Sequence, residues 1–104
     1  MCTLLILFRP KEKWPLIIAG NRDEILDRPW ISPGKHWPAY PNIIAGKDLT
    51  AGGSWLGINK TGLVATILNR KNSLGPSNDK FSRGEIIINV LKNNNINKAL
   101  AYLK

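Results

Sequence analysis

The stretch TLLILFRPKEKWPLIIA, residues 3–19, carries the first strand pattern of the chain. Two apolar runs, residues 3–8 and 14–19, flank a polar turn that contains Pro10, which is the pattern of a β-hairpin. Both runs are nearly continuous rather than alternating, so we expect strands that are buried on both faces. Because proline has no backbone N–H, we expect Pro15 to lie either at a sheet edge or at the start of the second strand.

A proline-rich segment follows this hairpin. Residues 27–41 contain four prolines, two of which are flanked by tryptophan. Proline fixes φ and removes a backbone donor, so the composition predicts an ordered loop with aromatic anchors rather than a helix. Further along, the apolar runs 56–59 and 63–69 flank turn residues and predict a second hairpin. A polar loop over 72–80, with Gly75 and Pro76, comes next.

Helical patterns occupy the last part of the chain. Ser82 and Glu85 have the S-x-x-E spacing of a capping box, in which each side chain satisfies the other residue's backbone N–H. Apolar residues at helical spacing follow, three asparagines interrupt them, and a second helical pattern begins at Ile96. Two hairpins followed by two helices predict a single α+β domain over residues 1–104.

The composition limits the classes of protein to which this chain can belong. The 104 residues (11.6 kDa) are 43% apolar and 21% charged, which fits one folded domain. The net charge of +8 is scattered along the chain, so we expect a solvated basic surface and no nucleic-acid partner. No apolar run is long enough for a membrane span or a signal peptide, so we expect no membrane partner and a cytoplasmic location. With one cysteine and one histidine, we expect no disulfide, no metal site and no cofactor.

Cys2 is the first candidate for chemistry. A small residue after Met1 permits removal of the initiator methionine, which would leave Cys2 with a free α-amino group. Such a residue holds both a thiol and an amine that can take the thiol proton, since peptide α-amines have pKa values of about 7.7–8.0. The alternative is a small apolar residue with no chemical role.

Two further segments carry polar or glycine-rich patterns. The tetrad Asn21-Arg22-Asp23-Glu24 follows directly after an apolar run, where a sheet would hold its side chains in place. It is a candidate site or an ion-paired turn. The second is Ala51-Gly52-Gly53-Ser54-Trp55-Leu56-Gly57-Ile58-Asn59. Its glycines let the backbone approach a ligand or another strand, but the segment has neither the P-loop nor the dinucleotide-binding pattern.

Taken together, these pieces resemble the NRDE-motif family, also called transport and Golgi organisation protein 2 and its bacterial homologues. The resemblance rests on the order Met1-Cys2-Thr3, Asn21-Arg22-Asp23-Glu24 with Arg28-Pro29, Ala45-Gly46-x-Asp48, Gly52-Gly53-Ser54-Trp55-Leu56-Gly57, Asn69 and Ser82-Arg83-Gly84. The family is similar to N-terminal-nucleophile hydrolases, which implies an αββα sandwich. Its members are usually more than twice as long, so the match implies the N-terminal portion of that sandwich. We therefore expect a truncated domain that self-associates or lacks a second half.

The resemblance extends to the choloylglycine-hydrolase branch of these enzymes and implies roles for single residues. It implies that Cys2 is the nucleophile, that Asp23 lies beside it and that Asn69 helps to form the oxyanion hole. Asn21, Arg22 and Trp55 are then the candidate substrate-binding residues. Gly20 stands where that branch has an arginine, so this guanidinium is missing unless Arg22 replaces it.

Two classes of function follow from the resemblance. The first is a cysteine-type amidohydrolase that cleaves a linear amide or related acyl bond of a small molecule. The second is a non-catalytic binding or trafficking protein for haem or a lipid-like ligand. In that second class the contacts would come from Trp30, Trp37, Trp55 and His36.

Overall fold

The computed structural model describes residues 1–72, 77 and 79–104, and within them the chain is α+β, as the sequence predicts. Two antiparallel sheets form, one of β1 and β2 and the other in the order β3-β4-β5-β6. The strands and helices are β1 (Leu4–Phe8), β2 (Leu16–Gly20), β3 (Trp30–Gly34), β4 (Ile43–Asp48), β5 (Leu56–Asn59), β6 (Val64–Thr66), α1 (Gly84–Leu91) and α2 (Ile96–Tyr102).

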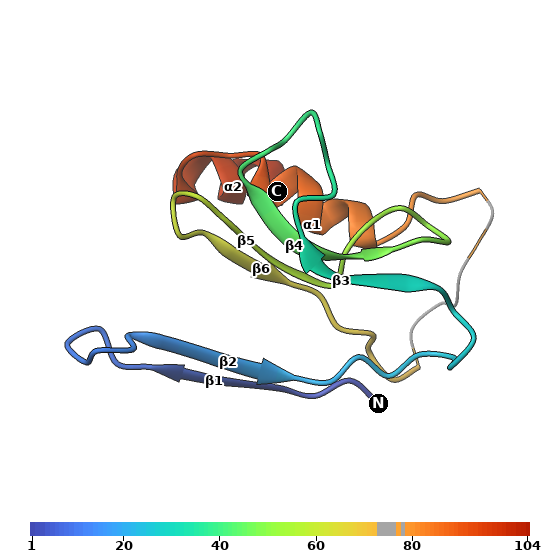
Figure 1. Cartoon of the computed structure of the whole chain (residues 1–104), viewed down its shortest axis with the longest axis horizontal. Helices are drawn as coiled ribbons and strands as arrows, with labels where there is room; N and C mark the ends of the chain where they lie inside the picture. The colour runs from blue at the N-terminus through green and yellow to red at the C-terminus, as the bar shows by residue number, and fades with distance from the viewer. Residues whose placement is uncertain (73–76, 78) are drawn as a thin grey trace.

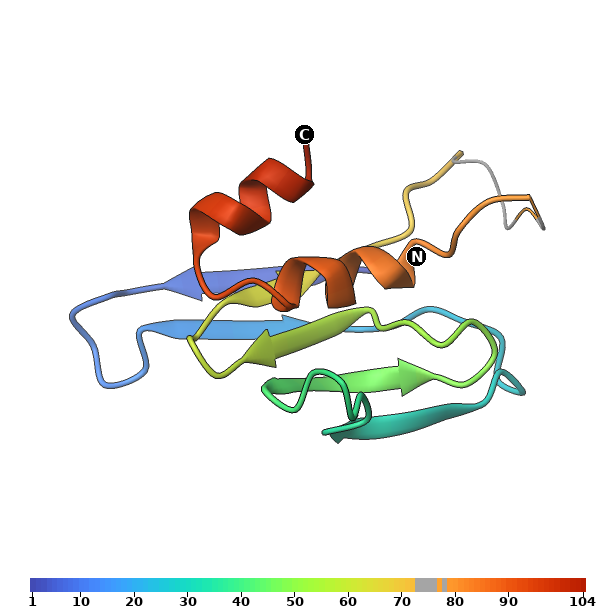
Figure 2. The same cartoon turned by 90° about the horizontal axis from the view of Figure 1, so that it is seen from above.

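The elements are arranged in layers. Both helices lie on one side of the four-stranded sheet, and the β1–β2 hairpin lies on the other side (Figure 1). The view from above shows α1 running over the sheet (Figure 2). Helix, sheet and second sheet in this order fit part of the αββα sandwich that the resemblance implies. Across the described ranges, no helix is long and apolar enough to cross a bilayer.

The hydrophobic core lies between α1 and the four-stranded sheet. Ile87 and Leu91 of α1 are almost fully buried and pack with Ile43 and Ala45 of β4. Spacings of four residues along the helix and two along the strand put these side chains on facing surfaces. Gly57 of β5 completes this contact, because a Cβ at that position would lie 2.6 Å from the Ala45 Cβ and 2.8 Å from a Leu91 methyl carbon.

The first hairpin forms as predicted, but its predicted burial is wrong. Its register pairs Leu4 with Gly20 and Leu7 with Ile17, and β2 begins directly after Pro15. Most of its apolar side chains are nevertheless exposed, among them Phe8 at 68%. Within the described residues no other strand or helix packs extensively on this hairpin, so a continuous apolar run here produces an uncovered apolar surface.

The four-stranded sheet holds two strands that the sequence analysis missed. β3 lies inside the segment predicted as a loop, and its register with β4 shifts between Ile31 and Gly34, where Pro33 cannot donate to the ladder. β4 is the central strand that joins β3 to the predicted second hairpin. That hairpin is confirmed, although β6 ends at Thr66.

The helix boundaries differ from prediction at α1. The Ser82 hydroxyl accepts from the Gly84 N–H at 3.2 Å, while no side-chain cap bond forms at the helix start, so the capping box is wrong. The asparagine break is confirmed, and Asn95 caps α2 by accepting from the Lys98 N–H at 2.9 Å. Gly75 and Pro76 of the predicted polar loop lie outside the described residues.

Candidate active site

Asn21 fixes the first residues of the chain. Its backbone N–H donates to the Thr3 carbonyl (3.2 Å), and its side-chain oxygen accepts from the Thr3 N–H (2.8 Å). Its side-chain amide also donates to the Met1 carbonyl (3.1 Å). These bonds continue the β1–β2 pairing beyond the ends of both strands and so place Cys2 beside the segment that follows β2.

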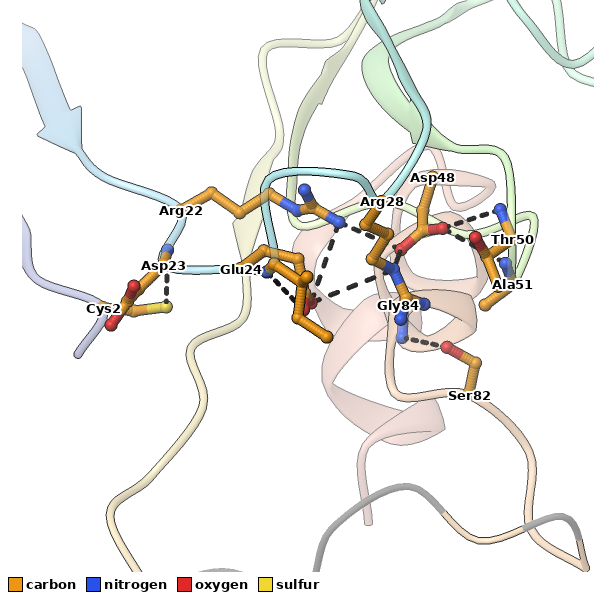
Figure 3. A network of polar contacts seen from close by, with 11 residues as sticks. Cys2, Arg22, Asp23, Glu24, Arg28, Asp48, Thr50, Ala51, Ser82 and Gly84 are labelled. Carbon is orange, nitrogen blue, oxygen red and sulfur yellow. Dashed lines mark hydrogen bonds and ion pairs between the residues drawn. The ribbon is translucent and has the colours of Figure 1, made fainter.

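Asp23 lies next to Cys2 on that segment. Its backbone N–H points at the Cys2 sulfur, with 3.4 Å between nitrogen and Sγ, and Figure 3 shows the two side chains together. The Asp23 carboxylate forms an ion pair with the α-ammonium group of Met1. Cys2 is half-buried. The thiol, the chain's amino terminus and one carboxylate therefore meet at one place.

An open hollow of about 420 Å³ surrounds this meeting point, lined by Met1, Cys2, Asp23, Asn69, Arg70 and Lys71. The three residues predicted as catalytic, Cys2, Asp23 and Asn69, thus come from three separate parts of the chain and line one space. Arg70 and Lys71, which follow Asn69, are part of the same lining, and no sequence pattern singled them out as site residues.

Arg22 points away from this hollow. In Figure 3 its side chain extends from the segment toward Asp48, and its Nη2 lies 3.1 Å from the Asp48 carboxylate. Its guanidinium also lies over the Trp55 ring, 4.5 Å from the ring centroid. The predicted substrate-binding residues Arg22 and Trp55 therefore contact each other in a second cluster, whereas Asn21 lies beside Met1.

The segment 21–24 consequently presents alternate residues to opposite sides. Asn21 and Asp23 face the amino terminus, while Arg22 and Glu24 join the second cluster. Glu24 lies 3.9 Å from both the Arg22 and Arg28 side-chain nitrogens. The ion pairs of Arg22 and Glu24 match the predicted alternative of an ion-paired turn, while Asn21 and Asp23 contact the first two residues of the chain.

Asp48 is the centre of the second cluster. Its carboxylate accepts from the Arg28 Nε at 2.7 Å and from the backbone N–H groups of Thr50 (2.9 Å) and Ala51 (3.2 Å). Partial burial alone would raise the pKa of Asp48, but the Arg28 hydrogen bond and the two backbone donors outweigh it, so the pKa is lowered. The same hydrogen bond raises the pKa of Arg28. Sequence reasoning missed this cluster, although Arg28-Pro29 and Gly46-x-Asp48 are among the motifs that carry the family resemblance.

The glycines of the motifs let these parts approach one another. A Cβ on Gly53 would lie 2.4 Å from the Gly84 carbonyl carbon, and a Cβ on Gly46 would lie 2.6 Å from the Trp55 ring. The Ser54 N–H donates to the Gly84 carbonyl at 3.1 Å. The Gly52-Gly53-Ser54 turn therefore packs on the start of α1 through Gly53, whereas Gly52 has open space around it and adopts a positive φ of 79°.

The aromatic residues considered for a haem or lipid ligand are divided between places. Trp30 meets Trp55 edge to face at 6.0 Å, whereas Trp37 packs against the core beside Lys47. His36 Nε2 lies 2.7 Å from the Ser32 carbonyl oxygen. A second hollow of about 390 Å³ lies between the start of α1 and Tyr102, and neither hollow is lined by tryptophan or His36.

Comparison with known proteins gives one consistent result. The family model described as "Transport and Golgi organisation 2" matches residues 1–104. The transport and Golgi organisation 2 homologues of mouse and human are each 34% identical to the chain over 113 aligned residues, and the bovine homologue is 32% identical over 111. Each alignment covers 100% of this chain and 39% of the relative, so the chain spans about two fifths of their length. No solved structure matches it.

Proposed function

The chain belongs to the transport and Golgi organisation 2 family, and on this premise we propose that it is an N-terminal-nucleophile hydrolase acting through Cys2. The proposed reaction is the hydrolysis of a linear amide or related acyl bond in a small molecule. The observation that carries the proposal is the convergence of the Cys2 thiol, the Asp23 carboxylate and Asn69 on one hollow.

The proposed nucleophile is Cys2 after removal of Met1. Asp23 already pairs with the terminal ammonium group of Met1, and its backbone N–H already contacts Sγ. The α-amine of Cys2, one residue further along the chain, would then have this carboxylate as its neighbour. A thiol and a positioned amine on one residue form a nucleophile with its own base.

The proposed hydrolysis proceeds through a thioester on Cys2. Sγ attacks the acyl carbon as the α-amine takes the thiol proton. The carbon–nitrogen bond then breaks, and the proton passes to the leaving nitrogen. Water hydrolyses the resulting thioester, which restores the thiol and releases a carboxylic acid. Asn69 would donate to the oxyanion of the tetrahedral intermediate, a contact whose loss typically costs about 10²–10³ in rate.

Two measurements on the purified 104-residue chain test this proposal. Mass spectrometry of the amino terminus should show that Met1 is absent. 4-Nitrophenyl acetate should then acylate Cys2, the chain's single cysteine, faster than it acylates a model peptide that begins with cysteine. Nitrophenolate release gives the rate, and peptide mapping gives the site.

Variants identify the contributing groups. Cys2→Ser should abolish the fast phase, and Asp23→Asn should slow it because the amine loses its partner. Asn69→Ala should slow it by about 10²-fold, while the exposed Asn94→Ala should leave it unchanged. Retained Met1, or acylation no faster than in the peptide, would contradict the hydrolase. That result would leave a non-catalytic binding protein for haem or a lipid-like ligand.

A further inference from the structure

The hollow around Cys2 has an uneven distribution of charge. Of its lining residues, the Met1 ammonium and the Asp23 carboxylate form an ion pair and offset each other. Arg70 and Lys71 then leave the lining with two uncompensated positive charges. Among the described residues that line the hollow, Asp23 is the only acidic one.

Other carboxylates of the chain do not neutralise this basic pair. The chain has seven Asp and Glu residues, and all seven lie in the described part of the structure. The ion pairs among described residues join acidic groups to Met1, Arg22 and Arg28, and none includes Arg70 or Lys71. Both side chains are exposed, so they can reach a solute that enters the hollow.

The position of Arg70 and Lys71 in the chain determines which part of a bound molecule they can contact. Arg70 and Lys71 directly follow Asn69, the residue proposed to bind the oxyanion, and they line the same space as the Cys2 thiol. A molecule whose acyl carbon lies at Sγ would therefore have Arg70 and Lys71 beside it. Arginine offers a planar fork of donors that matches a carboxylate, sulfonate or phosphate, and lysine adds a point charge.

We propose that the small molecule which reacts at Cys2 carries an anionic group and that Arg70 and Lys71 bind this group. This inference rests on the proposed function and specifies its substrate class. The two residues are specificity determinants: they attract and orient the anion, while the bond-breaking steps belong to Cys2, Asp23 and Asn69.

Alkylation by two matched probes tests the inference without a known substrate. Iodoacetamide and iodoacetate both react by the same step, in which the Cys2 thiolate forms a sulfur–carbon bond as iodide leaves. They differ in that iodoacetate carries a carboxylate. We expect the ratio of the iodoacetate rate to the iodoacetamide rate to be about fivefold higher for the protein than for a cysteine peptide in dilute buffer.

Variants and added salt distinguish the effect of Arg70 and Lys71 on this ratio from the effect of the chain's net charge. The double variant Arg70→Gln/Lys71→Gln should return the ratio to the peptide value, and a change in the amount of thiolate cancels in this ratio because both reagents react with the same thiolate. The matched control Lys11→Gln/Lys13→Gln removes the same charge from the hairpin turn, which lies far from the amino terminus (Figure 1), and should keep the ratio high. In 1 M NaCl, where the screening length is about 3 Å, the unmodified chain should also lose the enhancement.

A second pair of reagents extends the test to sulfonates. The 2-sulfonatoethyl and 2-trimethylammonioethyl methanethiosulfonates each form a disulfide with Cys2 as methanesulfinate leaves. We expect the ratio of the sulfonate reagent's rate to the cationic reagent's rate to be higher for the protein than for the cysteine peptide. Loss of this difference in the double variant would support an anion site that accepts sulfonates as well as carboxylates.

The outcomes distinguish this inference from the function on which it rests. A peptide-like ratio with both reagent pairs, or equal ratios in the double variant and the Lys11/Lys13 control, would overturn the anion site. Rapid acylation by 4-nitrophenyl acetate would in that case still support the hydrolase. Slow acylation together with a raised, salt-sensitive ratio would contradict the hydrolase and keep the anion site.

Discussion

Asp48 joins two arginines and a backbone turn through one carboxylate, and this makes it a determinant of acid stability. Its pKa is lowered in the folded chain, whereas an unfolded aspartate titrates near about 3.9. A carboxylate whose pKa is lower in the folded chain stabilises the fold at pH values above its pKa in the unfolded chain. This stabilisation is lost as the pH falls through the pKa that the carboxylate has in the folded chain. The free energy of unfolding should therefore decrease below about pH 4.

The variant Asp48→Asn tests this contribution. It should lower the free energy of unfolding at pH 7 by about 1.5–3 kcal/mol, because it breaks charge-assisted hydrogen bonds. It should also flatten the acid limb of the stability curve, since the titrating group is gone. Urea unfolding between pH 3 and 7 measures both effects. An acid limb as steep as that of the unmodified chain would assign the pH dependence to other carboxylates.

Asn21 is a single residue on which the position of Cys2 depends. Asn21→Ala removes the acceptor for the Thr3 N–H and the donor to the Met1 carbonyl. We expect faster hydrogen exchange at Thr3 and a loss of about 0.5–1.5 kcal/mol in unfolding free energy. Asn21→Asp is the matched control, because it keeps an acceptor oxygen for Thr3 and should retain most of the protection. Equal exchange in all three proteins would contradict this role.

At the scale of elements, the sequence predicts the strands and helices that a local pattern determines, and it misses a strand that forms only by pairing within the sheet. The two hairpins and the second helix follow from runs of apolar residues, turn residues and the break at three asparagines. β3 was not predictable because Pro33 within it and the neighbouring Pro29 oppose a strand, and it forms through pairing with β4. The placement of Cys2 near Asn69 came from the family resemblance, whereas the Asp48 cluster depends on contacts between distant segments.

Asn59 connects the β5–β6 turn to the end of α1. It is buried, its side-chain amide donates to the Leu91 and Asn93 carbonyls, and its side-chain oxygen accepts from Thr61 and Leu63. Asn59→Ala should lower the free energy of unfolding by about 2–4 kcal/mol, because several buried partners lose their bonds together. The exposed Asn94→Ala should change it by less than about 0.5 kcal/mol. Comparable losses in the two variants would contradict the proposed link.

The close approach of the Gly52-Gly53 turn to α1 gives a second test at this scale. Gly53→Ala would place a methyl group against the Gly84 backbone, and backbone cannot move aside as a flexible side chain can. We expect a loss of about 1–3 kcal/mol or more. Thermal unfolding measures it, with the exposed neighbour Ala51→Ser as the control. A melting temperature unchanged in Gly53→Ala would show that the turn adjusts.

At the scale of the whole molecule, the uncovered hairpin determines how the chain behaves in solution. Leu5, Ile6, Leu7 and Phe8 are between 46% and 68% exposed, and contiguous apolar surface of this kind favours association. We expect the 104-residue chain to self-associate as its concentration rises. Light scattering of Leu7→Lys/Ile17→Lys, which charges a cross-strand pair, should show less association. A monomer at every concentration in the unmodified chain would contradict this expectation.

The alternation along residues 21–24 has a consequence for genetics. Substitutions at Arg22 and Glu24 act on an ion-pair cluster that holds the loops together, so their harm should be relieved by stabilising mutations elsewhere or by lower growth temperature. In the proposed hydrolase, substitutions at Asn21 and Asp23 also change the surroundings of the Cys2 thiol, so a global suppressor would restore stability without restoring the missing chemical group. Substitutions at the four adjacent codons therefore fall into two classes, one relieved by lower temperature and one not, and the classes alternate codon by codon. A saturation screen at two temperatures would separate them.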